Sequence, residues 1–201
     1  MSDFFTPPPP KLDPVDEQPP WFGPPENELG VPVQTRLLLA RTEKVALALV
    51  DTVAYSTGLE FGLEVRLRET DELSDPFGMR YRRPGELRDD VLRFGFELAD
   101  GRRVANLGGF TPIDEERRDP VLMQRGGSGG NRSWSFRYWL WPLPPPGTLT
   151  VVIQWPSEGV QLTRFELAAE PLLEAAAESE QLWPGGGPST GGGVVSTHRS
   201  G

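Results

Sequence analysis

The stretch from Leu59 to Arg68 reads LEFGLEVRLR, and every second side chain in it is apolar. A strict period of two is typical of a β-strand that has one face in the protein core and the other in water. The stretch Val91–Leu98 reads VLRFGFEL and follows the same rule, with Arg93 and Glu97 on its polar side. These two stretches predict half-buried strands, and therefore a β-rich domain.

Strand-like segments recur along the middle of the chain. Val45–Ala54 is apolar on both faces apart from Asp51 and Thr52, as in a central strand. Further strands are expected at Arg103–Leu107, Ser133–Trp141 and Gly147–Trp155. Short strands separated by Gly and Pro predict an all-β fold, an immunoglobulin-like antiparallel β-sandwich of about seven to nine strands. A closed barrel is the alternative, and the lack of a βαβ pattern argues against a doubly wound fold.

Turn-forming residues stand between these strands. Ser56-Thr57-Gly58 is expected to join the strands at 45–54 and 59–68. The Asp100-Gly101 pair tolerates positive φ and is expected to close a hairpin. Pro144–Gly147 is expected to form a stiff turn between the strands at 133–141 and 147–155.

One helix is expected, over Pro171–Leu182, where it would close over an end or a face of the sandwich. Proline is favoured in the first turn of a helix, and Glu170 and Glu174 complement the positive end of the helix dipole. The apolar side chains that fall roughly along one face are Leu172, Leu173, Ala176, Ala177 and Trp183.

Two longer segments, Thr70–Asp90 and Gly108–Arg132, interrupt the strands. The second is expected to begin a helical turn at Thr111 and to end in a flexible connection at Gly126–Gly130. This run of glycines does not predict a phosphate-binding loop, because neither Lys-Ser/Thr nor a helix follows it.

Proline and glycine concentrate at the two ends of the 201-residue chain, which holds 22 prolines and 23 glycines. The composition predicts a Pro-rich, acidic, disordered tail at 1–30, a β-sandwich domain at 31–184 that includes the helix at 171–182, and a Gly-rich, disordered tail at 185–201. Of the net charge of −9, −5 lies in residues 1–30 and −3 in residues 169–201, which leaves −1 for 31–168. Acidic flanks repel nucleic acid and anionic membranes, so neither is expected as a partner.

The sequence contains no cysteine, which excludes disulfides and thiolate metal sites. The sequence lacks a run of about 18 apolar residues, so we expect no membrane-spanning helix. It also lacks a basic region followed by an apolar stretch at the N-terminus, so we expect no signal peptide. The expected location is therefore cytoplasmic.

Few residues are suited to catalysis. The one histidine, His198, falls in the Gly-rich tail, where it lacks the held geometry that a catalytic triad or a metal site requires. Carboxylates cluster in three loops, at Asp71-Glu72-Asp75, Asp89-Asp90 and Asp114-Glu115-Glu116-Asp119. Arginines lie near each cluster, which favours solvated ion pairs over an active site. We therefore expect no cofactor, no metal and no enzymatic activity, with a hydrolase that uses paired loop carboxylates as the alternative.

The aromatic strand at 133–141 is the most informative segment for function. One of its faces carries Trp134, Phe136, Tyr138 and Leu140, and the other carries Arg137, Trp139 and Trp141. Since one face serves the core, the second is the candidate binding surface of a non-catalytic interaction domain. The expected partner is a protein whose identity is unknown, and a sugar ring stacked on the tryptophans is the alternative. The competing and favoured interpretation is that the helix or the N-terminal segment around Trp21 covers these tryptophans.

Several short motifs occur together: WFGPPEN at 21–27, ADGR at 99–102, NLGG at 106–109, WLWPLPPPG at 139–147 and LWP at 182–184. In these motifs the stretch 21–184 resembles a family of uncharacterised actinobacterial, Streptomyces-like proteins with a WPLPPPG hairpin. The resemblance implies a bacterial cytoplasmic protein. It implies no activity, substrate or catalytic residue, so the functional hypotheses depend on the residues themselves.

Overall fold

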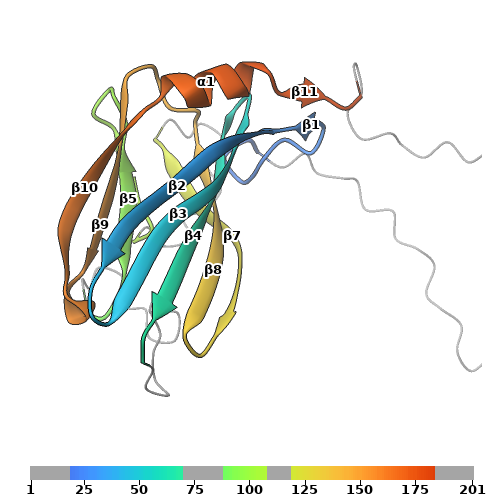
Figure 1. Ribbon diagram of the computed structural model, residues 1–201. Coiled ribbons are helices and arrows are strands. Elements are labelled where there is room, and N and C mark those ends of the chain that lie inside the picture. Colours follow the sequence, from blue (N-terminus) through green and yellow to red (C-terminus); the bar gives the residue numbers. More distant parts are fainter. Residues whose placement is uncertain (1–18, 70–87, 108–118, 184–201) are drawn as a thin grey trace, which may run out of the picture.

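The computed structural model describes residues 19–69, 88–107 and 119–183, and their strands form two facing sheets (Figure 1). The five-stranded sheet has the order β2 (Val31–Arg41), β3 (Val45–Tyr55), β4 (Gly58–Leu67), β8 (Ser133–Trp141) and β7 (Val121–Gly130). The four-stranded sheet has the order β10 (Val160–Ala168), β9 (Thr148–Trp155), β5 (Arg93–Glu97) and β6 (Arg103–Ala105). Every strand pair is antiparallel, which confirms the predicted all-β sandwich.

An aromatic cluster joins the two sheets. Phe61 of β4 and Tyr138 of β8 come from the five-stranded sheet, and Phe94 and Phe96 of β5 come from the other. The centroid of the Phe61 ring lies 5.8 Å from that of Phe94, 5.1 Å from that of Phe96 and 6.0 Å from that of Tyr138. All four side chains are buried, so the inward faces predicted from the period of two are confirmed.

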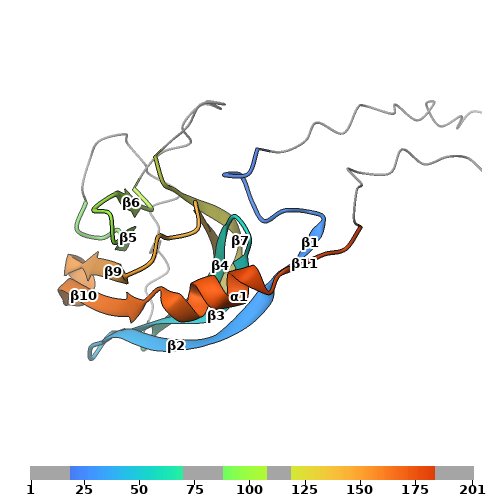
Figure 2. The same cartoon turned by 90° about the horizontal axis from the view of Figure 1, so that it is seen from above.

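The helix α1 (Glu170–Ala177) covers one end of the sandwich, beside β2 and β3 (Figure 2). Leu172 and Ala176 are its buried residues. The start of α1 is tied to the turn before β9, because the backbone amide of Gly147 donates to the Glu170 carboxylate over 3.2 Å. A short 3₁₀ helix, η1 (Pro156–Glu158), links β9 to β10. Neither of the helices in the described residues has the length and apolar character needed to cross a membrane.

The predicted C-terminal end of the helix, at Leu182, is wrong. Residues 180–181 form the strand β11 (Glu180–Gln181), which pairs with β1 (Glu28–Leu29) as a separate two-stranded sheet. Backbone pairing with the N-terminal segment therefore replaces the last helical turn. As a result Trp183 does not continue the apolar face of the helix and is 64% exposed.

The prediction of a disordered tail over 1–30 is wrong for residues 19–30. Trp21 is buried at 5% exposure, and β1 lies in this segment. The error arose because a single buried tryptophan has no periodicity to detect. Residues 1–18 and 184–201, which include His198 and the predicted tail at 185–201, lie outside the described residues.

The glycine run at 126–130 is part of β7 and is paired with β8, so the predicted flexible connection is wrong. A Cβ atom at Gly127 would lie 2.6 Å from the Phe136 ring, which shows that glycine leaves room for this ring on the neighbouring strand. The helical turn predicted at Thr111 lies outside the described residues.

The segment 142–147 is not a hairpin, contrary to the prediction. It follows β8 in the five-stranded sheet and leads to β9 in the four-stranded sheet, so it crosses between the two layers. The Leu143 amide donates to the Thr57 carbonyl over 2.8 Å, which anchors the crossing to the turn between β3 and β4.

We predict that Phe61→Ala lowers the free energy of unfolding by about 3–5 kcal/mol, because it leaves a cavity among the rings that join the sheets. Leu38→Ala, which truncates a side chain that is 53% exposed on β2, is the control and should stay within about 0.5 kcal/mol of the unmutated chain. Chemical denaturation followed by circular dichroism measures both. Equal losses in the two variants would contradict the role of the aromatic cluster.

Candidate functional site

The three predicted binding residues, Arg137, Trp139 and Trp141, lie on β8 on the outer side of the five-stranded sheet. Trp139 is completely buried and Trp141 is half-buried. Trp139 therefore does not belong to an exposed tryptophan platform. The favoured interpretation of the sequence, in which the N-terminal segment covers it, agrees with the structure.

The cover is the segment 19–29, which we call the strap. The Trp139 indole nitrogen donates a hydrogen bond to the Pro20 carbonyl over 3.1 Å. The Tyr55 ring packs edge-on against the Trp139 ring, with 5.7 Å between their centroids. A second anchor comes from β7, where Arg125 donates to the Phe22 carbonyl over 2.9 Å and stacks its guanidinium 4.9 Å from the centre of the Phe22 ring.

Arg137 keeps access to solvent, as the half-buried Trp141 does, with 43% of its side chain exposed. It donates to the Asp51 backbone carbonyl over 3.1 Å and lies 3.5 Å from the Asp51 carboxylate. An exposed ion pair of this kind contributes little to stability, so it is compatible with a contact role.

A hollow of about 470 Å³ lies where the strap meets the sheet, and Arg137 lines it. Its other polar lining residues are Glu26, Glu28, Tyr55, Glu60 and Arg125. Both Glu28 oxygens accept hydrogen bonds from Ser56, at 2.6 Å from the backbone nitrogen and 2.5 Å from the hydroxyl. Burial, followed by the nearby charges of Glu60 and Glu28, raises the pKa of Tyr55, so its hydroxyl stays protonated. The polar groups of this hollow anchor the strap.

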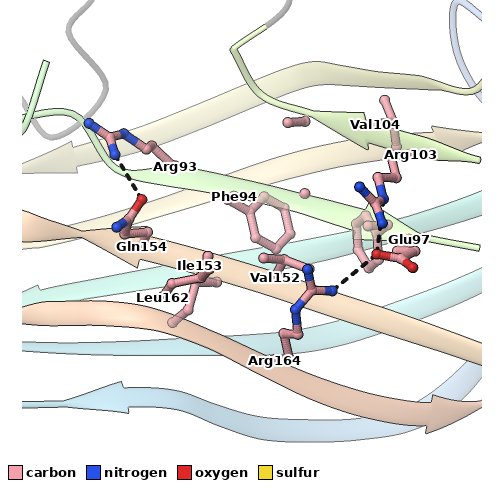
Figure 3. A pocket seen from close by; sticks show the side chains of 13 residues that line it. Arg93, Phe94, Glu97, Arg103, Val104, Val152, Ile153, Gln154, Leu162 and Arg164 are labelled. Atoms are coloured by element: carbon pink, nitrogen blue, oxygen red, sulfur yellow. Dashed lines mark hydrogen bonds and ion pairs between the residues drawn. The ribbon is translucent and has the colours of Figure 1, made fainter. Parts of the chain in front are cut away.

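A second hollow, of about 360 Å³, lies on the outer face of the four-stranded sheet (Figure 3). Gly95 is one of the residues that line it, and it is paired in register with Val152 on one side and Ala105 on the other. A Cβ atom at Gly95 would collide with the Val104 carbonyl, so this position admits no side chain. We call this hollow the arginine groove, because Arg93, Arg103 and Arg164 line it together with Glu97, Gln154 and Leu162.

The period of two places these side chains. On β5, Phe94 and Phe96 point into the core, and Arg93, Gly95 and Glu97 therefore point outward. The outward direction predicted for Arg93 and Glu97 is confirmed. The groove itself was not predicted, since Arg103 and Arg164 reach it from strands whose order in the sheet the sequence does not reveal.

Opposite charges hold one end of the arginine groove. The Glu97 carboxylate accepts from Arg164 Nη1 and Arg103 Nε, each at 3.0 Å. The hydrogen bonds from Arg164 and then Arg103 hold the pKa of Glu97 below its usual value. Side-chain exposure is 71% for Arg103 and 51% for Arg164, so both guanidiniums still face solvent.

At the other end of the groove, Figure 3 shows Arg93 bonded to Gln154. It donates to the Gln154 side chain over 2.7 Å and to the Asp89 carboxylate over 3.1 Å. Three guanidiniums and the Glu97 carboxylate line the groove, and Asp89 pairs with Arg93, so these side chains together carry one net positive charge inside an acidic protein. Such a surface can bind a carboxylate or another anion.

The carboxylates of the alternative hydrolase hypothesis do not come together in the described residues. The clusters at 71–75 and 114–116 lie outside them, and Asp119 is exposed. Asp89 pairs with Arg93, and Asp90 pairs with Arg88, whose hydrogen bonds hold the pKa of Asp90 below its usual value. In the described part of the chain, no group of three or more His, Cys, Asp or Glu residues could hold a metal ion.

We predict that Glu97 titrates below the usual pH range of a glutamate and that Arg164→Ala raises its pKa. A lowered pKa means that the pairing stabilises the fold at neutral pH and that this contribution is lost as the pH falls towards the pKa of the folded state. Carbon-13 NMR of the side-chain carboxyl groups measures both values, with Arg36→Ala on β2 as the control. If the pKa of Glu97 is the same in Arg164→Ala as in the unmutated chain, the pairing of Glu97 with Arg164 does not lower it.

Comparisons with known proteins place the chain in no family: no family model, curated protein or solved structure matches it.

Proposed function

We propose that this protein is a non-catalytic binding domain and that the arginine groove is its contact surface for a partner protein. The observation that carries the proposal is the pair of solvent-exposed guanidiniums of Arg103 and Arg164 in a groove whose lining includes Gly95, a position with no side chain. A concave surface with an apolar floor and a few fixed polar groups is typical of a ligand site.

The ligand that fits this chemistry is an extended acidic segment. Arg103 and Arg164 each use a donor on Glu97, and a guanidinium has five N–H donors in all. Both side chains therefore retain donors for a second carboxylate. Leu162, 59% exposed at the rim, offers apolar contact to a neighbouring side chain of the same ligand.

Carbohydrate binding and hydrolysis receive less support. The alternative partner, a sugar ring, would stack on Trp139 and Trp141, and the strap buries Trp139. The described loop carboxylates Asp89 and Asp90 are engaged with arginines rather than converging on a pocket. The immunoglobulin-like topology, the bacterial source, the cytoplasmic location and the absence of enzymatic activity remain predictions.

We predict that a peptide alternating Glu and Leu over five residues binds the arginine groove and that its Lys-for-Glu counterpart does not. Nitrogen-15 NMR of the labelled protein should show shifts at the amides of Gly95, Ala105 and Val152. Arg103→Ala/Arg164→Ala should weaken binding at least tenfold, since a hydrogen bond to a charged group is worth about 1.5–3 kcal/mol.

The control variant is Arg36→Ala/Arg41→Ala, which removes two exposed arginines from β2 in the other sheet. It should bind the acidic peptide as the unmutated chain does. Binding of both peptides with equal affinity, or an equal loss in the control variant, would show that the groove does not recognise acidic segments.

A further inference from the structure

The strap covers Trp139 without joining the sheet as a strand. Between Pro19 and Asn27 it has no strand pairing, and its internal backbone hydrogen bond runs from the Phe22 amide to the Pro19 carbonyl over 2.9 Å. The sheet holds this part of the strap through side chains, namely the Trp139 indole on β8 and the Arg125 guanidinium on β7. This mode of contact resembles the docking of a peptide on a preformed surface.

The contacts select residue types at successive positions. Trp139 requires a carbonyl acceptor, which Pro20 supplies, and the next side chain, Trp21, is buried at 5% exposure. Phe22 places a ring under the Arg125 guanidinium. At Gly23 a Cβ atom would lie 2.7 Å from the centre of that same guanidinium, so the end of the Arg125 side chain would have to shift to make room for it.

The strap contains one buried polar group without a partner, and its two parts are held by different contacts. The Trp21 indole nitrogen is buried and has no hydrogen-bond partner among the described residues. Burial of this indole is therefore less favourable than burial of a hydrogen-bonded one. Glu28 is fixed separately to Ser56, and Asn27 accepts from the Trp183 amide over 2.8 Å. The contacts that hold residues 19–26 are therefore separate from those that hold residues 27–29.

We propose that the face formed by Trp139, Tyr55 and Arg125 is a second binding site, which reads a Trp-aromatic-Gly-Pro segment. In the isolated chain residues 19–26 occupy it as a ligand in cis, and a partner protein that carries the same sequence chemistry displaces them. This site lies on the opposite sheet from the arginine groove and does not depend on it. Because the strap is tethered, it competes at a high effective concentration and weakens the binding of any free segment.

The test uses a fluorescein-labelled peptide with the sequence of residues 19–26, PPWFGPPE, and the full-length variant Trp21→Ala. This variant removes the buried side chain of the cis ligand and leaves Trp139 and Arg125 in place. Fluorescence anisotropy should show the peptide binding Trp21→Ala at least tenfold more tightly than the unmutated chain. Leu38→Ala, a truncation elsewhere on the same sheet, should bind as the unmutated chain does.

Two further measurements test the specificity of the site. A peptide with Ala at the position of Trp21 should lose binding, because it lacks the buried ring, and Trp21→Ala/Arg125→Ala should bind the original peptide at least tenfold more weakly than Trp21→Ala. Equal binding in either comparison would overturn the proposal. So would a folded Trp21→Ala variant that does not bind the peptide.

Hydrogen exchange on the unmutated chain makes the test independent of whether Trp21→Ala folds. The amide of Phe22, which donates to the Pro19 carbonyl, should exchange faster than the amides of β3 and β4, because the strap opens locally. Exchange of the Phe22 amide as slow as in β3 and β4 would show that the strap is part of the cooperative core and would overturn the proposal.

Discussion

The contact of Phe61 with Phe94, Phe96 and Tyr138 determines how the two sheets lie on each other. Because these rings fill the space between β4, β8 and β5, the register of each strand is fixed: a slip of one residue would move its aromatic side chains into water. The same constraint fixes the outer faces. Arg93, Gly95 and Glu97 reach the arginine groove because the alternate residues of β5 are in the core.

The two outer faces of the sandwich are used differently. On the five-stranded sheet the chain covers its own aromatic surface with the strap, so that Trp139 is buried although it points away from the core. On the four-stranded sheet no described segment covers the arginine groove, whose rim side chains Arg103 and Leu162 remain exposed. Burial of a large aromatic side chain is favourable even outside the core, whereas a guanidinium group is well hydrated and can stay in contact with water.

The strands with a clear period of two were the predictable part of the fold. β8 has its predicted bounds, and β3, β4 and β9 begin or end within one residue of theirs. β2 and β10 were not predicted, and β7 was mistaken for a loop because its glycines carry no periodic signal. At the candidate sites, the outward direction of Arg137 and Glu97 followed from the sequence. The strap and the groove did not, since both depend on which distant strands become neighbours.

The pairing of β1 with β11 has a mechanical consequence. Glu28 pairs with Gln181 and Leu29 with Glu180, so the chain enters and leaves this two-stranded sheet at the same end. A force that pulls the two flanking segments apart therefore first detaches residues 19–26 from Trp139 and Arg125. It then acts on one residue pair of the small sheet at a time, starting with the bonds between Asn27 and Trp183. Tension would unzip this small sheet at low force before it loads β2 or α1, and the sandwich would be shielded from moderate pulling on its ends.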